Sequence, residues 1–259
     1  AFYSCQHRNH SIIDFLGSEA HDVRFLTDSL KMMEQLPDIV LLDNLKAKLA
    51  AHKGGKLFVV LHCYGAHFNY YDRYPRNEAY FQPDVIPSAS KKYRSNMINA
   101  YDNVIRQTDK LVAGVIQALQ ALRVPAAMCY VGDHGEDIFD DSRERFLHSS
   151  PIPTYYQLRV PFVLWASDEY KASYFDKWHQ VVVHQKVPIS TNRVTFHTLL
   201  DMSGIACSSL NKQSALSNRD FRQKPRLYVN DHNEYRPLDD CGLKDLDAEQ
   251  FKLHHLQYP

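Results

Sequence analysis

Two residues able to bind a metal ion, Asp133 and His134, stand side by side between Gly132 and Gly135, directly after the apolar run 126–131. Neighbours within a regular strand point to opposite faces, but where a strand breaks into a loop both side chains can converge. A carboxylate oxygen and an imidazole nitrogen are typical ligands of Zn²⁺. In open α/β sheets, ligands bind beyond the carboxyl ends of the strands. The pair is therefore a candidate zinc site. The alternative is that Asp133 caps a helix and His134 is an ordinary loop histidine.

Three further histidines lie at a strand end or in a loop that follows one. His62 and His67 flank the turn at Gly65 after the apolar run 57–61, and His148 lies in a later loop. The side chain of His67, which comes after the turn, could face a cleft. A single histidine is nevertheless more often a hydrogen-bonded structural residue than a ligand. Both alternatives therefore stay open for each histidine when it is considered alone.

Apolar strands alternate with amphipathic helices, which predicts an α/β fold with a largely parallel central sheet and helices on both of its faces. The expected strands lie at 1–6, 57–62, 126–131, 160–165 and 227–230, and the expected helices at 38–51, 96–122 and 194–202. Residues 67–92 are expected to form a long loop, and about 236–259 a polar tail. No domain boundary is visible in the sequence.

Composition and motifs exclude several classes of function. Lys+Arg and Asp+Glu both number 30, and a chain without net positive charge is a poor candidate for binding nucleic acid. No apolar stretch approaches the roughly 18 residues of a membrane helix, so we expect the chain as given to be soluble. Glycine-rich phosphate loops, G-x-S-x-G and H-E-x-x-H are all absent. The five cysteines form no C-x-x-C pair, which excludes a zinc knuckle and leaves disulfide pairing open.

An acidic group formed by Asp137, Asp140 and Asp141 follows the Asp133-His134 pair. The group lacks the ligand spacing and the final glutamate of an EF-hand loop, so it does not predict a calcium site. We interpret it as a solvated turn.

Several motifs, taken together and in order, resemble those of one known family. They are Leu61–His67 with Tyr70–Pro75, Asn99–Asn103, Gly132–Glu136, Leu147–His148, Val160–Trp165 and Phe196–Leu200. The pattern resembles that of bacterial phosphoethanolamine transferases, in the sulfatase-like branch of the alkaline phosphatase superfamily. It extends from residue 1 to about residue 205. The resemblance implies an alkaline phosphatase/sulfatase-like fold.

The resemblance also implies a reaction. Family members transfer phosphoethanolamine from phosphatidylethanolamine to lipid A or another cell-envelope glycan, with zinc as the cofactor and a threonine as the nucleophile. Asp133 and His134 match the family's zinc ligands. His67 and His148 match the histidines that line the substrate phosphate site, and they are the catalytic candidates. The implied location is the periplasm of a Gram-negative bacterium, in a protein anchored in the inner membrane by an N-terminal region.

The family's threonine nucleophile and a glutamate zinc ligand lie upstream of a segment like the one around Phe2. We therefore expect residues 1–259 to be an N-terminally truncated, C-terminal part of the catalytic domain. Alone, this part should be inactive and bind zinc weakly. An exposed strand edge is expected near Ala1–Ser4. The alternatives are a sulfatase or phosphodiesterase of the same superfamily, or a non-catalytic envelope module.

Overall fold

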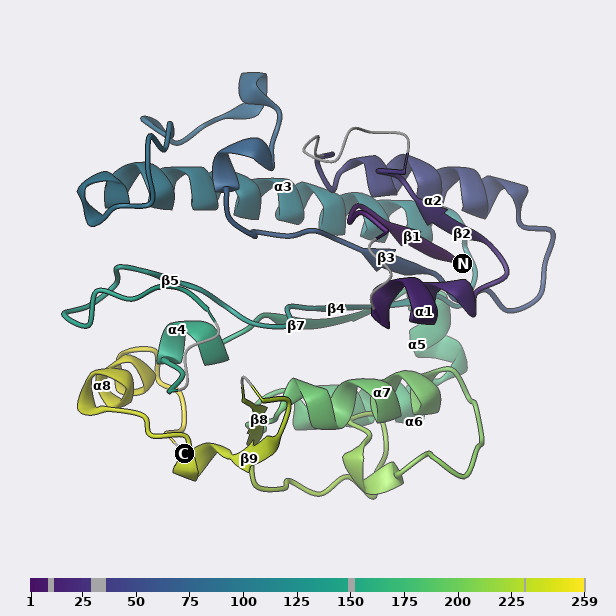
Figure 1. The fold of residues 1–259 in the computed structure, drawn as a ribbon. Helices are drawn as coiled ribbons and strands as arrows, with labels where there is room; N and C mark the ends of the chain where they lie inside the picture. Colours follow the sequence, from purple (N-terminus) through teal and green to yellow (C-terminus); the bar gives the residue numbers. More distant parts are fainter. Residues whose placement is uncertain (9–11, 29–35, 149–151, 231, 259) are drawn as a thin grey trace. The chain divides into compact units, whose positions relative to one another are not determined.

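The chain divides into two units, residues Ala1–Ala121 and Leu122–Pro259. The computed structural model describes residues 1–8, 12–28, 36–148, 152–230 and 232–258 (Figure 1). Ser149 and Ser150, which follow His148 in the sequence, lie outside the described residues. The division was not predicted, because it falls at the end of a long helix, where the composition does not change.

Unit 1 contains a three-stranded parallel sheet in the order β2-β1-β3. Its helices and strands are β1 (Phe2–Ser4), α1 (Ile12–Ser18), β2 (Val23–Phe25), α2 (Val40–Ala51), β3 (Val60–His62) and α3 (Arg94–Ala121). The expected long loop holds three short 3-10 turns, at Tyr70–Asp72, Arg76–Glu78 and Lys91–Tyr93. Because β1 has a partner on each side, the expectation of an exposed strand edge near Ala1–Ser4 is wrong.

Helices cover both faces of this sheet. The ring of Phe2 lies against Gly17 of α1, where an added Cβ would come within 2.9 Å of the ring. The hydroxyl of Tyr3 donates to Asp22 over 2.7 Å, and Lys48 of α2 donates to the same carboxylate over 2.8 Å. Neighbouring strand residues point to opposite faces, so α1 and α2 lie on opposite sides of the sheet, as Figure 1 shows. The predicted parallel sheet between helices is thus present in unit 1.

The longest helix, α3, forms where the helical spacing predicted it. Its buried apolar residues recur at intervals of three, four and seven: Met97, Ala100, Val104, Leu111 and Val115. Gly114 packs against Leu42 of α2, and an added Cβ would be 2.4 Å from a Leu42 methyl group. In the described part of the chain, no helix is both long enough and apolar enough to cross a membrane.

Unit 2 is built around an antiparallel pair of strands, β4 and β7. Its helices and strands are β4 (Ala127–Val131), β5 (Asp137–Ile138), β6 (Phe146–Leu147), α4 (Tyr155–Leu158), β7 (Phe162–Ala166), α5 (Asp168–Ser173), α6 (Phe175–His184), α7 (Thr191–Met202), β8 (Leu227–Val229), β9 (Tyr235–Pro237) and α8 (Asp245–Leu253). The sequence predicted the positions of β4 and β7, but the expectation of a largely parallel sheet is wrong for this pair, which is antiparallel. A hairpin and one helical turn join them instead of a crossover helix, so the chain returns antiparallel.

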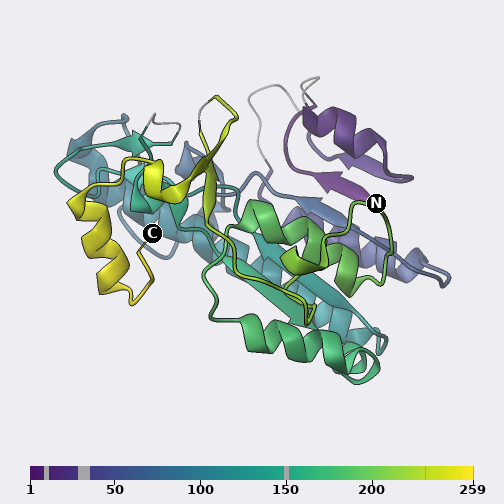
Figure 2. The same ribbon diagram turned by 90° about the horizontal axis from the view of Figure 1, so that it is seen from below.

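One face of β7 packs on the following helices. Leu164 and Ala166 contact a cluster that includes Tyr170 of α5, Val181 of α6 and Met202 of α7. A second cluster places Phe162 against Val194 of α7. The contacting strand residues alternate along β7, as expected for a strand with one covered face. Figure 2 shows the helices α6 and α7 from below.

The C-terminal stretch is folded, although its composition suggested a polar tail. Helix α8 places the buried Phe251 against the ring of Tyr155, with 5.1 Å between the ring centroids. Asp247 of the same helix is fully buried. Its carboxylate accepts two hydrogen bonds from Arg143, each 2.8 Å long, and one of 2.8 Å from the backbone N–H of Tyr155. Burial acts to raise the pKa of Asp247, but these hydrogen bonds outweigh it and lower the pKa.

The acidic group after β4 is not a solvated turn. Asp137 is buried and accepts hydrogen bonds from Thr154 over 2.8 Å and Gln157 over 2.5 Å. Asp141 forms an ion pair with Arg143, whose hydrogen bonds lower the pKa of the Asp141 carboxyl. The prediction failed because Asp137 has its partners, Thr154 and Gln157, outside the acidic group, and because Arg143 pairs with Asp141 within the turn.

A substitution in unit 1 should change the titration of Asp22. Hydrogen bonds from Lys48 and Tyr3 lower the pKa of Asp22 to about 2 from an ordinary value of 3.8. A depressed pKa means that the stabilisation is complete above the unfolded value and is lost as the pH falls from about 4 to about 2. We expect Lys48→Met to move the Asp22 pKa towards 3.8, measured by NMR titration of the carboxyl carbon. Lys46→Met, on the exposed side of α2, should leave it unchanged. An unaltered value in Lys48→Met would contradict the assignment.

A substitution in unit 2 tests the pair between Arg143 and Asp247. Arg143→Met leaves the buried carboxylate without its two-point partner, and removal of one member of a buried ion pair costs about 3–5 kcal/mol. We expect a loss near the lower end, because backbone N–H groups still bind Asp247. Urea unfolding would measure it. Arg236→Met, which breaks an exposed pair with Glu234, is the control and should have a much smaller effect. Equal effects of the two substitutions would refute the interpretation.

Candidate metal site

The hairpin of β5 and β6 brings Glu136 and His148 together. Asp137 pairs with Leu147 in the antiparallel ladder, so the residues just outside this pair lie opposite each other. The Nδ1 atom of His148 is 3.0 Å from Oε1 of Glu136. The Glu136 side chain is only 4% exposed and that of His148 is 25% exposed. Leu147 has a φ of +66°, a left-handed conformation that turns the chain immediately before His148.

His134 joins this pair from the loop that follows β4. Its ring centroid lies 3.8 Å from that of His148, with 32° between the ring planes. One ligand atom from each of His134, Glu136 and His148 can be chosen so that all three lie within 4.8 Å of one another. A backbone carbonyl can only accept, so the 3.0 Å contact to Gly135 makes Nδ1 of His134 a donor. In the neutral ring, Nε2 then carries the lone pair for a metal ion.

Asp133, which the sequence paired with His134, lies beside this group and is not one of its three members. Its side chain is 92% exposed, and Oδ2 is 3.7 Å from Nε2 of His134. The other carboxylate oxygen accepts a 3.0 Å hydrogen bond from the backbone N–H of His134. Asp133 is therefore close to the ligand atom of His134, on the solvent side.

Gly135 and Asp137 hold the hairpin against α4. The Gly135 N–H donates to the carbonyl of Gln157 over 2.8 Å, and an added Cβ at Gly135 would lie 2.0 Å from the Tyr156 carbonyl oxygen. No side chain fits there, because the obstructing atom belongs to the backbone. Asp137 accepts from Thr154 and Gln157, and burial, partly offset by these hydrogen bonds, raises its pKa. The close approach to α4 therefore sets the direction of His134 and Glu136.

The three donors fit a zinc ion chemically. A catalytic zinc commonly has three protein ligands drawn from histidine, glutamate, aspartate and cysteine, with one position open. Two imidazoles and one carboxylate match that composition. The sequence motif contained Glu136, but no role was assigned to it, because only the ladder of β5 and β6 shows that it lies opposite His148.

His67 lies in unit 1, in the loop after β3, and its side chain is exposed. Its Nδ1 donates to the Phe68 carbonyl over 2.8 Å, and its ring meets that of Tyr64 edge-on at 5.3 Å. Arg73 donates to the His67 carbonyl over 3.0 Å. Asp38 accepts 2.8 Å hydrogen bonds from the N–H groups of Tyr64 and Gly65. The start of the loop and the backbone of His67 are thus both held by charged side chains.

The same turn requires a glycine and donates hydrogen bonds to the half-buried carboxylate of Asp38. Gly65 has a φ of +68°, a backbone conformation that residues other than glycine rarely adopt. Burial raises the pKa of Asp38, and the two backbone hydrogen bonds oppose that shift. His62, the other histidine of this segment, lies 2.9 Å from the Ser4 hydroxyl and stacks on Phe2. The structure gives His62 the contacts of a structural histidine.

Curated relatives include two phosphoethanolamine transferases. The Kdo(2)-lipid A phosphoethanolamine 7''-transferase of Salmonella typhimurium is 38% identical over 138 residues, which cover 52% of this chain and 24% of the relative. The phosphoethanolamine transferase EptA of Helicobacter pylori is 32% identical over 170 residues, covering 63% of this chain and 30% of the relative. The aligned part thus spans about a quarter to a third of these relatives.

Solved structures share the fold. The zinc complex of the C-terminal periplasmic domain of EcEptC from Escherichia coli aligns with a TM-score of 0.75 at 19% identity, covering 92% of this chain and 68% of that one. The soluble domain of lipooligosaccharide phosphoethanolamine transferase A from Neisseria meningitidis gives a TM-score of 0.72 at 20% identity, covering 86% and 67%. These likenesses confirm the predicted α/β, sulfatase-like fold.

The family model described as Sulfatase matches residues 5–205. This range coincides with the segment that carries the sequence motifs, and it contains both the His67 loop and the hairpin with Glu136 and His148. The chain belongs to the sulfatase family.

Proposed function

We propose that this chain is the sulfatase-fold part of a phosphoethanolamine transferase acting on lipid A or another cell-envelope glycan. The names of the relatives support this assignment, and so do the ordered motifs. The observation that carries it is the group of His134, Glu136 and His148, whose ligand atoms lie within 4.8 Å of one another. A phosphoryl-transfer enzyme needs a site of this kind to neutralise charge on the transferred group.

The proposed metal is zinc, held by His134 and Glu136, with Asp133 at the exposed side of the same loop and His148 beside the ion. When bound, zinc would supply Lewis-acid stabilisation of the negative phosphoryl oxygens. Glu136 accepts a hydrogen bond from Nδ1 of His148. This bond orients the ring and makes Nε2 the atom that would exchange a proton in the reaction. Asp133 is close enough to His134 to join the ligand set through a small movement.

In the proposed reaction, a threonine hydroxyl attacks the phosphorus of phosphatidylethanolamine, and the bond to the diacylglycerol oxygen breaks. A hydroxyl of the glycan then attacks the phosphothreonine, and the threonine oxygen leaves. Each attacking hydroxyl loses a proton and each leaving oxygen gains one. His67 and His148 are the proposed acid and base groups for these transfers. The periplasm, with an N-terminal membrane anchor, is the proposed location of the whole protein.

Zinc affinity should depend on the hairpin. We expect His148→Ala and Glu136→Gln each to weaken Zn²⁺ binding by roughly tenfold or more, because loss of a ligand or of its orienting partner costs that much. Calorimetric titration in the presence of a competing chelator would measure the affinities. His179→Ala, an exposed histidine on α6, is the matched control and should bind zinc normally.

A different pattern would point to different ligands. If Asp133→Ala abolished zinc binding while Glu136→Gln bound normally, the ion would be held by Asp133 and His134 alone. Glu136 would then act only as an ion-pair partner of His148.

Activity should depend on both catalytic candidates. In the full-length protein, we expect His67→Ala and His148→Ala to lower phosphoethanolamine transfer by about 100-fold or more, the usual contribution of a positioned acid or base. Mass spectrometry of lipid A, incubated with phosphatidylethanolamine as donor, would measure the transfer. His179→Ala should retain full activity.

Two results would overturn the proposal. Hydrolysis of a sulfate ester or a phosphodiester, without transfer to a glycan, would show a sulfatase or phosphodiesterase. Normal modification of the glycan by both alanine variants would show that neither histidine takes part in the chemistry.

A further inference from the structure

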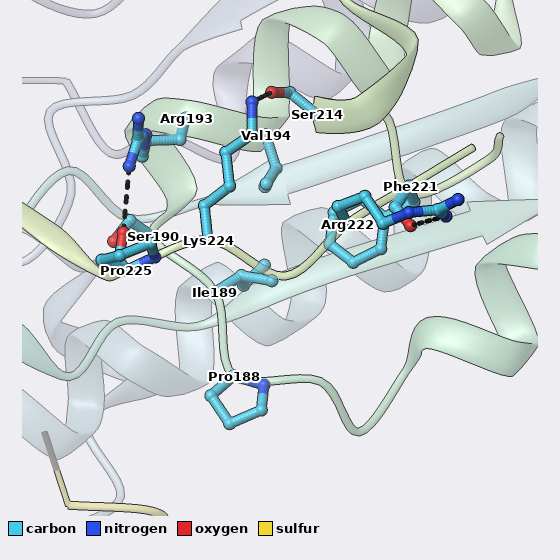
Figure 3. Close-up of a pocket in the computed structure, with 10 residues that line it drawn as sticks. All are labelled: Pro188, Ile189, Ser190, Arg193, Val194, Ser214, Phe221, Arg222, Lys224 and Pro225. Carbon is cyan, nitrogen blue, oxygen red and sulfur yellow. Dashed lines mark hydrogen bonds between the residues drawn. The ribbon is translucent and has the colours of Figure 1, made fainter. Parts of the chain in front are cut away.

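Unit 2 contains a basic hollow between the start of α7 and the segment 221–225, shown in Figure 3. Its volume is about 280 Å³, including the part open to solvent. Three of its lining residues are cations, Arg193, Arg222 and Lys224. Within the described chain, no carboxylate lines the hollow. Buried Val194 and Phe221 form part of its apolar wall.

The cations of this basic hollow are held by neutral groups. Arg193 donates to the Pro225 carbonyl over 3.0 Å, and Lys224 donates to the Ser214 hydroxyl over 3.0 Å. Figure 3 shows these two side chains on the same side of the Phe221 ring, with the guanidinium of Arg222 beyond it. Arg222 donates to the Phe221 carbonyl over 2.9 Å. Among described residues, none of the three forms an ion pair with a carboxylate.

These contacts orient the cations without neutralising them. A lysine ammonium has three donors and an arginine guanidinium has five, so one hydrogen bond to a neutral oxygen leaves further N–H groups for another acceptor. Lys224 also affects a neighbouring histidine. The pKa of His197 on α7 is lowered, first by burial of its ring and second by the charge of Lys224. The local field is therefore positive.

We propose that the basic hollow binds a phosphate group, either as free orthophosphate or as a phosphate monoester carried on a lipid headgroup. Phosphate offers several strong acceptors and up to two negative charges, which suit a site with two oriented cations. The apolar wall strengthens the attraction, because charges interact more strongly where water is partly excluded. This inference is independent of the proposed transferase function, and the hollow shares no residue with the group of His134, Glu136 and His148.

Titration of the chain with orthophosphate tests the proposal. Metal is first removed with a chelator, so that the group of His134, Glu136 and His148 cannot capture phosphate through an ion. We expect saturable binding by calorimetry, with amide shifts in NMR spectra at Lys224 and Arg193. Lys224→Gln and Arg193→Gln should each weaken it by about tenfold, the usual effect of losing one charge-assisted hydrogen bond. Lys252→Gln, an exposed lysine on α8, is the matched control.

Vesicles separate the two sources of phosphate. Phosphatidylcholine vesicles with phosphatidic acid present a lipid phosphate monoester, and pure phosphatidylcholine vesicles do not. Sedimentation with the first kind only, lost in Lys224→Gln, would show that the hollow accepts a lipid headgroup. Binding of orthophosphate without sedimentation would restrict the site to free phosphate. Both outcomes support the proposal.

A further variant and a stability measurement separate loss of phosphate binding from loss of folding. Lys224→Arg keeps the charge and should bind phosphate within a few-fold of the unchanged chain, and thermal unfolding of each variant shows whether it is folded. The proposal is overturned if neither phosphate source binds. It is also overturned if folded Lys224→Gln and Arg193→Gln bind as tightly as Lys252→Gln does.

Discussion

The buried carboxylate of Asp247 determines how unit 2 presents its candidate metal site. Asp247 accepts hydrogen bonds from the Arg143 guanidinium in the hairpin turn and from the Tyr155 N–H at the start of α4. A carboxylate can be buried only when such donors compensate for its lost hydration. One side chain of α8 therefore fixes the turn of the hairpin and the helix beneath it. The ladder of β5 and β6 then places Glu136 opposite His148.

Other buried or half-buried aspartates act in the same way. Asp137 joins the hairpin to Thr154 and Gln157, and Asp38 holds the turn before His67. Asp201 of α7 accepts from Ser217 and Asn218 in the segment that follows this helix. Each carboxylate offers several acceptor sites at one point, so it can bind donors from loops that would otherwise bury unpaired N–H groups. These residues therefore help to fix the positions of the loops.

Glu136 is also nearly buried, but its surroundings differ from those of the structural aspartates. Its near neighbours in the candidate site are imidazoles, which bind transition metals. A carboxylate in this position can accept a hydrogen bond from His148 or share a metal ion with both histidines. The structural aspartates have guanidinium, ammonium, hydroxyl, amide and backbone donors as partners instead. The difference in partners separates the residues that support the site from those that can take part in its chemistry.

The sequence by itself determined the local features of this protein. Helical spacing located α2, α3 and α7, apolar runs located β3, β4 and β7, and the ordered motifs identified the family. These signals depend on residues close together in the chain. The antiparallel return of β7, the burial of Asp137, the folded α8 and the meeting of Glu136 with His148 could not be predicted. Each depends on partners far away in sequence, such as Asp247 and Arg143, 104 positions apart, and only the tertiary structure decides which of them meet.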